Sequence, residues 1–368
     1  MNNPTTAEKT TTVKTKHRQN LLAVVLSCAP ATLAIFAAVA PASAEESRLT
    51  AKMIQDRDFP SRSNTEAGQR ILASAPPDVP GHRQFMGFMF AVLEGKSKAL
   101  PFTPPVPENV SAHPDLTYLT VGKKELKLDL YRPKATAKPA PLVVLIHGGC
   151  WMDGSRKEMG FYAVNLARLG YVTASVDYRL SEEAPYPAAV EDMRAAIQWL
   201  TDHAATNNID PERIAIMGGS AGGHLTEYLG YSANTPTKGH PQGVGPKVKA
   251  IIPFYGWSDL TDPSVNYQYY MELFLGKKYA DAPKLYEEAS PITHVDKGDP
   301  ATLLLHGTID TIVPITQAEK LAKKLETNKV PFVYAPFKGG YHGYDMFTDA
   351  NPGVMYLIEH FLAEYLAK

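Results

Sequence analysis

Short apolar runs without polar alternation recur along the chain from residue 141 onward. A run of this kind is typical of a strand that is buried on both faces, as in a parallel sheet. The runs occupy residues 141–146, 171–176, 214–217, 248–252, 302–305 and 332–334. Between them, residues 188–201 and 317–325 carry apolar side chains at helical spacing. We therefore predict an α/β fold in which a mainly parallel central sheet is flanked by helices on both faces.

The segment before these runs has a different pattern. Residues 116–121 and 126–131 alternate apolar and polar side chains on either side of Gly122 and Lys123. Alternation on both sides of a turn predicts a hairpin of two half-buried strands.

One connection between the predicted strands is much longer than the others. Residues 253–301 separate two apolar runs and contain many aromatic residues. A connection of this length usually carries its own structure and a function. We predict a small lid insertion at about residues 256–298, over the carboxyl ends of the strands. Its aromatic residues can form either the walls of a pocket or the core of the lid itself.

The N-terminal residues have the composition of a targeting segment. Four Lys or Arg residues precede an almost wholly apolar stretch at 21–40, and Ala42, Ser43 and Ala44 follow it. This order is that of a signal peptide with a small-residue cleavage site. We predict that residues 1–44 are a signal peptide cleaved near Ala44, and that the exported protein is periplasmic or secreted, without stable membrane association. The alternative is an uncleaved anchor, because a stretch of this length can span a bilayer.

Residues 45–110 differ from the remainder of the mature chain. They contain little apolar mass and end in a connector with four prolines between residues 101 and 107. Such a connector is stiff and extended. We predict an N-terminal arm that packs over the main domain, which comprises residues 111–368.

Charge and cysteine content limit the classes of partner. Lys plus Arg number 37 and Asp plus Glu number 38, which gives a net charge of −1. Without a basic excess, nucleic acid is not an expected partner. Cys28 and Cys150 are too few for a disulfide scaffold or a multi-cysteine zinc site. Neither composition nor motifs indicate an oligomeric state.

The sharpest motif is Gly-Gly-Ser-Ala-Gly at residues 218–222. It directly follows the apolar run at 214–217 and precedes residues 224–229, which can be helical. A serine between small residues in a tight strand-to-helix turn has the context of a nucleophile elbow. Ser220 is therefore the candidate nucleophile. The alternative, a glycine-rich turn with an ordinary serine, does not require this context.

A serine hydroxyl needs a base, and the base needs an acid to orient it. In this type of fold the chain order is serine, acid, histidine. Asp310 lies in the loop after one predicted strand, and His342 lies in a glycine-flanked loop after the next. We predict that both form a triad with Ser220. His306 competes as the base, but its place at a strand end favours a role in tethering a loop; Asp259 competes as the acid.

The loop at residues 147–151, His-Gly-Gly-Cys-Trp, follows the first apolar run. Backbone N–H groups in such a loop, together with the one after the nucleophile, can bind a developing oxyanion. The candidate donors are Gly149, Cys150 and Ala221. The candidate substrate-pocket residues are Trp151, Tyr255 and Trp257.

From about Asp115 to its C-terminus, the chain resembles α/β-hydrolases of the esterase/lipase type. It is similar to hormone-sensitive-lipase-like and BD-FAE-like carboxylesterases. The resemblance rests on the loop at 147–151, Asp-Tyr-Arg-Leu at 177–180, the segment 186–192, the elbow, and His-Gly-Thr-Ile-Asp at 306–310. The chain departs from the family pattern at Cys150, where many members have glycine or tyrosine.

The resemblance implies an activity and a role for each candidate residue. Ser220 is implied as the nucleophile, His342 as the base and Asp310 as its orienting acid, on small ester or carbohydrate-ester substrates. An acyl-enzyme mechanism of this kind requires no metal or organic cofactor. Two alternatives stay open: an amidase or peptidase, of the formamidase or prolyl-peptidase type, and a catalytically inactive binding module.

Overall fold

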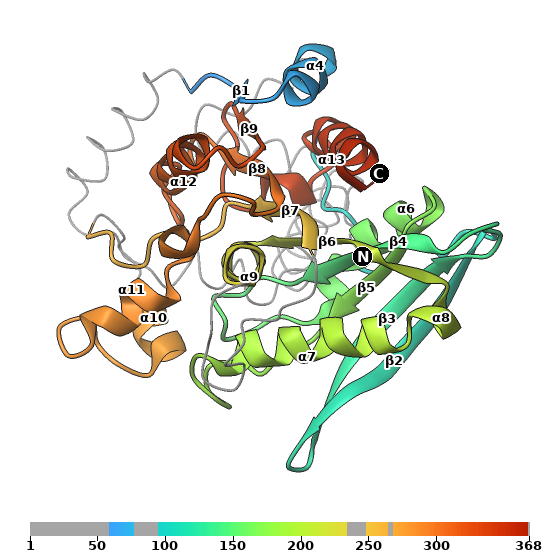
Figure 1. Ribbon diagram of the computed structural model, residues 1–368, viewed down its shortest axis with the longest axis horizontal. Helices are drawn as coiled ribbons and strands as arrows, with labels where there is room; N and C mark the ends of the chain where they lie inside the picture. Colours follow the sequence, from blue (N-terminus) through green and yellow to red (C-terminus); the bar gives the residue numbers. More distant parts are fainter. Residues whose placement is uncertain (1–58, 77–94, 234–247, 264–267, 367–368) are drawn as a thin grey trace, which may run out of the picture.

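A twisted central sheet runs through the molecule (Figure 1). The computed structural model describes residues 59–76, 95–233, 248–263 and 268–366. In these residues the sheet has nine strands in the order β1-β9-β8-β7-β6-β4-β5-β3-β2. The strands are β1 (Arg62–Ser63), β2 (Val110–Val121), β3 (Lys124–Pro133), β4 (Ala140–Ile146), β5 (Val172–Val176), β6 (Ile209–Gly219), β7 (Val248–Phe254), β8 (Ala301–Gly307) and β9 (Phe332–Phe337).

Helices follow most of the strands. The α-helices are α4 (Glu66–Ser74), α6 (Gly160–Arg168), α7 (Ala188–Asp202), α8 (Ala204–Asn207), α9 (Ala221–Tyr231), α10 (Gln268–Leu275), α11 (Pro283–Ala289), α12 (Thr316–Thr327) and α13 (Asn351–Leu366). Short 3₁₀ helices are η1 (Arg156–Met159), η2 (Pro291–His294) and η3 (Tyr344–Met346). All six apolar runs of the sequence form strands, and both predicted helices are present as α7 and α12.

The strands from β4 to β9 pair in parallel, in the order β5-β4-β6-β7-β8-β9. At one edge β3 pairs antiparallel with β5, and at the other β1 pairs antiparallel with β9. The prediction of a mainly parallel sheet flanked by helices is therefore confirmed.

Both faces of the sheet are covered, which explains the unbroken apolar runs. In β4, Val144 and Ile146 belong to a core that includes side chains of α7, α9 and α12. The intervening Val143 and Leu145 belong to a second core, on the opposite face, with side chains of α6 and α13. All four are fully buried. A strand between two cores has no position for an exposed polar residue.

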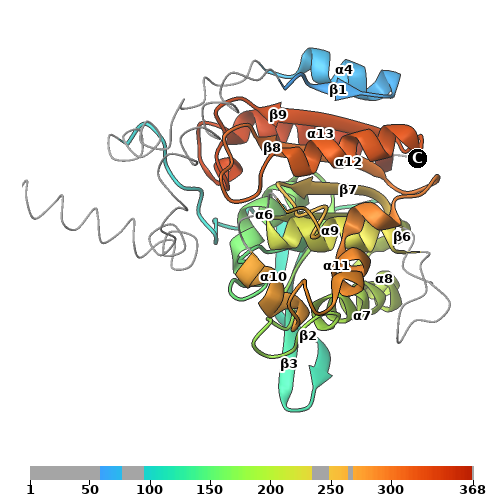
Figure 2. The ribbon, with the colours of Figure 1, turned by 90° about the vertical axis from the view of Figure 1, so that its left-hand side faces the viewer.

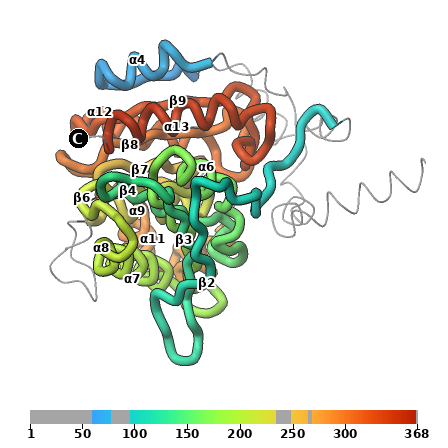
Figure 3. Tube along the Cα trace, turned by 90° about the vertical axis from the view of Figure 1, so that its right-hand side faces the viewer, coloured from blue at the N-terminus to red at the C-terminus, as the bar shows by residue number. Residues whose placement is uncertain are grey.

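The predicted hairpin forms the edge of the sheet and extends beyond the rest of the molecule at one end (Figures 2 and 3). Val121 pairs with Lys124, so Gly122 and Lys123 are the two turn residues. Gly122 has a φ of 61°, a conformation that glycine adopts without strain.

The N-terminal segment packs against the opposite edge of the sheet where it is described. There β1 pairs with β9, and α4 packs against β9 and α13. Just before the proline connector, residues 98–100 run beside the end of η3: Leu100 N donates to Met346 O at 2.8 Å, and Thr348 N donates to Lys98 O at 2.9 Å. In its described residues, this segment therefore contacts the edge strand β9, α13 and the chain beside η3.

One prediction, the signal peptide at residues 1–44 with its apolar stretch, falls outside the described residues. Among the described helices, none is long and apolar enough to cross a membrane.

The insertion between β7 and β8 carries α10, α11 and η2. Its aromatic residues Trp257, Phe274 and Tyr286 are at most 2% exposed and belong to the core shared with α7 and α9. Phe274 stacks on Trp151, with ring centroids 4.4 Å apart. Of the two roles left open for the insertion aromatics, these three side chains therefore have the packing role.

Candidate active site

Ser220 occupies a sharp turn between β6 and α9, with φ 57° and ψ −119°. The turn brings neighbouring backbones so close that side chains would clash. A Cβ on Gly218 would lie 2.6 Å from the Gly222 carbonyl oxygen, and one on Gly222 would lie 2.2 Å from the Ile146 oxygen. Ser220 N donates to Phe254 O at 3.0 Å, which ties the turn to β7. The small residues of the motif are therefore required by the strained conformation that projects the serine hydroxyl.

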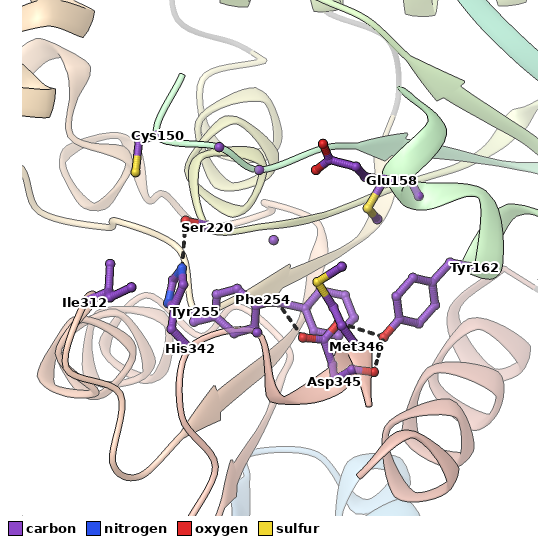
Figure 4. A pocket seen from close by; sticks show the side chains of 15 residues that line it. Cys150, Glu158, Tyr162, Ser220, Phe254, Tyr255, Ile312, His342, Asp345 and Met346 are labelled. Atoms are coloured by element: carbon purple, nitrogen blue, oxygen red, sulfur yellow. Dashed lines mark hydrogen bonds between the residues drawn. The ribbon is translucent and has the colours of Figure 1, made fainter. Parts of the chain in front are cut away.

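Ser220, His342 and Asp310 lie in one hydrogen-bonded row (Figure 4 shows the first two). His342 Nε2 is 2.9 Å from Ser220 Oγ, and His342 Nδ1 is 2.7 Å from Asp310 Oδ2. All three residues are at most 7% exposed. Since an ionised carboxylate can only accept, the row requires a proton on Nδ1 and leaves Nε2 to accept the serine proton. The structure thus brings together the three residues that chain order suggested.

The orientation of Asp310 is set by its own loop. Its Oδ1 accepts hydrogen bonds from the backbone N–H groups of Ile312 and Val313, both at 2.9 Å. His306 Nε2 lies 2.8 Å from Val313 O and ties the end of this loop to β8. Burial lowers the pKa of His306, which favours the neutral form. His306 therefore holds the loop that carries the acid. Asp259, the competing acid, is bound instead by Lys320 at 3.2 Å.

The loop after β4 has a tight, left-handed backbone at three consecutive residues. Gly149, Cys150 and Trp151 have φ values of 102°, 53° and 59°. The N–H groups of Met152 and Asp153 both donate to Gly149 O, at 2.9 and 3.1 Å, and close the turn. Gly149 and Cys150 line the same pocket as Ser220.

Ala221, the third candidate donor, is the first residue of α9. The N–H groups in the first turn of a helix have no partner within that helix, and they form the positive end of its dipole. The N–H of Ala221 is therefore well suited to an anionic oxygen beside Ser220.

Tyr178 supports the loop after β4 through two contacts with His147. Its ring stacks on His147 with centroids 4.3 Å apart, and its hydroxyl donates to His147 O at 3.1 Å. The sequence singled out the segment 177–180 only through resemblance. The structure gives it a physical role, which is to support the backbone of the loop.

Cys150 is buried beside the nucleophile, with 6% of its surface exposed. Burial raises the pKa of its thiol to about 11. Because the thiolate is the reactive form of cysteine, this thiol is a poor nucleophile near neutral pH. The hydrogen bond of His342 is made to Ser220 and not to Cys150.

The pocket in front of Ser220 is lined mainly by apolar and aromatic side chains (Figure 4). Tyr255, one of the three predicted pocket residues, lines it. The prediction for Trp151 and Trp257 was wrong. Both are at most 2% exposed, and they pack in the core on α9 and the insertion instead. The residues around the pocket are Gly148, Gly149, Cys150, Glu158, Met159, Tyr162, Gly219, Ser220, Phe254, Tyr255, Ile312, His342, Gly343, Asp345 and Met346.

Two acidic residues of this lining were missed by the sequence analysis because no motif contains them. Burial, with a further contribution from Asp153, raises the pKa of Glu158 to about 7. Asp345 is buried and accepts hydrogen bonds from the Tyr162 and Tyr255 hydroxyls at 2.7 and 2.6 Å. No Lys or Arg is among the lining residues. In the described part of the chain, no group of three or more His, Cys, Asp or Glu side chains is arranged to hold a metal ion.

Comparison with known proteins relates this site to esterases. Esterase LipC of Mycobacterium tuberculosis is 32% identical over 236 residues, which are 61% of this chain and 59% of LipC. The chain spans about three fifths of the length of the curated relatives it matches.

Solved structures of esterases are also similar to this chain in fold. A truncated carbohydrate esterase from gut microbiota superimposes with a TM-score of 0.63 at 26% identity, over 72% of this chain and all of the other. Thermogutta terrifontis esterase 2, phosphonylated by sarin, superimposes with a TM-score of 0.60 at 25% identity, over 72% of this chain and 98% of the other.

The BD-FAE family profile matches residues 128–325, more than half of the chain, and this span contains the loop after β4, the elbow and Asp310. The chain therefore belongs to the BD-FAE family and has the α/β-hydrolase fold.

Proposed function

We propose that this protein is a serine carboxylic-ester hydrolase that works through an acyl-enzyme on Ser220. The observation that carries the proposal is the buried row of hydrogen bonds, 2.9 Å from Ser220 to His342 and 2.7 Å from His342 to Asp310, beside an apolar pocket. A nucleophile, a base and an orienting acid in mutual contact are the parts that acyl transfer requires.

The first half of the reaction forms the acyl-enzyme. His342 Nε2 takes the proton of Ser220 as Oγ attacks the ester carbonyl carbon. Asp310 accepts the hydrogen bond from Nδ1 and stabilises the imidazolium that results. His342 then gives the proton to the leaving alcohol oxygen as the carbon–oxygen bond breaks. In the second half, water attacks the acyl group by the same proton transfers, and the carboxylic acid leaves.

Charge on the carbonyl oxygen develops in front of the loop after β4. The N–H groups of Gly149, Cys150 and Ala221 are the proposed donors to that oxygen. Donors that are already in place cost no reorganisation during the reaction, which makes this a large contribution to catalysis. Hydrogen bonds and stacking from Tyr178 hold the loop in the required conformation.

The relatives support an ester substrate. LipC is named an esterase, and the superimposed structures are those of a carbohydrate esterase and of an esterase that sarin phosphonylates. The pocket adds a charge preference: Glu158 and Asp345 supply its carboxyl groups, and no Lys or Arg lines it. We infer that uncharged small esters, carbohydrate esters among them, are preferred over esters that carry a carboxylate.

Paired chromogenic substrates test the proposal. The purified protein should hydrolyse p-nitrophenyl acetate much faster than p-nitroacetanilide, because an anilide leaves less readily and needs closer proton delivery. Ser220→Ala should lose on the order of 10⁶ in kcat while remaining folded. Faster cleavage of the anilide would favour the amidase alternative. Absence of turnover with either substrate and with a panel of acyl esters would favour an inactive binding module.

A further inference from the structure

Tyr255 packs against both His342 and the turn that carries Ser220, the two groups that exchange a proton in the proposed reaction. Its ring centroid is 4.5 Å from that of His342, with the planes tilted by 58°. On the other side it packs against the elbow, where a Cβ added to Gly219 would lie 3.1 Å from the Tyr255 hydroxyl. Any shift of this ring therefore changes the space available to His342 and to the turn that carries Ser220.

The backbone of Tyr255 is held in an unfavourable conformation. Its φ is 37°, in the left-handed region that non-glycine residues rarely adopt. Tyr255 N donates to Leu305 O at 2.8 Å, at the end of β8. Strain of this kind persists only when surrounding contacts compensate for it, and it concentrates at functional sites.

The main polar contact of the Tyr255 side chain is a buried carboxyl group. The Tyr255 hydroxyl donates to Asp345 Oδ1 at 2.6 Å, and the Tyr162 hydroxyl donates to Oδ2 at 2.7 Å (Figure 4). Asn351 Nδ2 donates to the Asp345 carbonyl at 3.2 Å. Hydrogen bonds from α6 and from the start of α13 thus fix the position of Asp345. Asp345 in turn fixes the position of the Tyr255 hydroxyl.

These contacts close a ring of interactions around the base. Asp345 follows His342 by three residues and accepts a hydrogen bond from Tyr255, and the Tyr255 ring packs against the His342 ring. Burial, followed by the nearby Asp345 carboxyl, raises the pKa of Tyr255, so the phenol keeps its proton and acts as a donor. Each carboxyl oxygen of Asp345 accepts a hydrogen bond from a tyrosine.

We propose that Asp345 is a positioning residue that, through the Tyr255 hydroxyl, holds the His342 ring in line with Ser220. The inference rests on the proposed function, because it requires His342 to be the base. Small displacements of a base reduce the rate of the chemical step strongly while leaving substrate binding largely intact. Loss of the Asp345 carboxyl group is therefore expected to lower kcat and to leave KM nearly unchanged.

Two tyrosine-to-phenylalanine variants distinguish a positioning role of the Tyr255 hydroxyl from a general effect of losing a buried hydroxyl. Tyr255→Phe removes only the hydroxyl that binds Asp345. Tyr231→Phe is the control: it removes a hydroxyl that lies 2.9 Å from Thr302 Oγ1 and is also buried, but at the far end of α9 from Ser220. With p-nitrophenyl acetate, Tyr255→Phe should lower kcat roughly tenfold and leave KM within about twofold. Tyr231→Phe should change kcat less than about twofold, even where thermal unfolding shows a loss of stability.

A second pair of variants tests whether the two residues act together. Asp345→Ala removes both oxygens that accept from the tyrosines and should also lower kcat, with KM little changed. Because both substitutions remove the hydrogen bond between Tyr255 and Asp345, Tyr255→Phe/Asp345→Ala should have a kcat close to that of the slower single variant. Equal kcat for Tyr255→Phe and Tyr231→Phe, or losses that multiply in the double variant, would overturn the inference. A wild-type protein without ester hydrolysis would overturn the proposed function instead.

Discussion

At the scale of single residues, Cys150 is where a thiol mechanism would compete with the serine mechanism. The thiol lies beside Ser220, but burial raises its pKa to about 11 and the base is bound to the serine. The contribution of Cys150 is its backbone, which has a φ of 53° within the loop of proposed oxyanion donors.

Substitution at Cys150 distinguishes the thiol from the backbone. Cys150→Ala and Cys150→Gly should keep kcat within about tenfold, whereas loss of one oxyanion donor costs roughly 10²–10³. Cys150→Pro removes the N–H but also requires a φ near −65°, so it will disrupt the loop as well as the donor. Kinetics with p-nitrophenyl acetate and circular dichroism provide the measurement. Folded but inactive Ala and Gly variants would assign the nucleophile to Cys150.

The residues that the sequence could and could not identify differ in how they are brought together. Ser220, Asp310 and His342 each follow a recognisable strand, and parallel strands deliver their C-terminal loops to one edge of the sheet. Tyr162 and Asp345 have no such marker. They are 183 residues apart in the chain and meet through a hydrogen bond between α6 and η3, which no local sequence pattern records. The wrong pocket prediction for Trp257 has the same origin, because aromatic character does not tell packing from lining.

At the scale of elements, the strands and helices predicted from the sequence were most complete where the sequence pattern was simple. The strands buried on both faces were recognised because each is a short unbroken apolar run. The helix α13 was missed because it begins with Asn351, Pro352 and Gly353, which are typical of turns. Its buried apolar residues from Val354 to Leu362 do fall at helical spacing, but Met355 and Tyr356 lie among them and blur the contrast between the two faces.

The helix α9, which starts directly after the nucleophile, contains the buried acid Glu227, and its effect on the free energy of unfolding depends on pH. Burial raises the pKa of Glu227 to about 8, from 4.5 for an unperturbed glutamate. Between these values the folded protein binds more protons than the unfolded chain, so this group's stabilising contribution is complete below about pH 4.5 and is lost as pH rises through 8. Glu227→Gln should therefore gain thermal stability over wild type as pH rises from 5 to 9.

The measurement is the difference in Tm between variant and wild type across that pH range. Glu326→Gln, on an exposed position of α12, is the matched control and should show no such trend. A Tm difference for Glu227→Gln that stays constant with pH would mean that Glu227 does not change its charge in this range.

At the scale of the whole molecule, the N-terminal arm closes one edge of the sheet and reaches the site. The short strand β1 covers the backbone of β9, which would otherwise be an open edge. Residues 98 and 100 then form backbone hydrogen bonds with Thr348 and with the pocket residue Met346. The arm therefore joins the far edge of the domain to the loop that carries His342.

We propose that the chain reaches this form after export and removal of residues 1–44. The basic residues before the apolar stretch at 21–40 and the Ala42-Ser43-Ala44 sequence support this. Intact mass measured on protein recovered from the periplasm or medium should correspond to a chain that begins near Glu45. Recovery of the full-length chain in the membrane fraction would favour the uncleaved anchor.

Covalent labelling by a fluorophosphonate tests the central claim most directly. The reagent phosphonylates a serine only when a base activates it, so peptide mass spectrometry should find a single adduct, on Ser220. Ser220→Ala should abolish the adduct. His342→Gln should suppress it, while His306→Gln, where it folds, should still be labelled. An adduct on another residue, or an active enzyme that is never labelled at Ser220, would contradict the account.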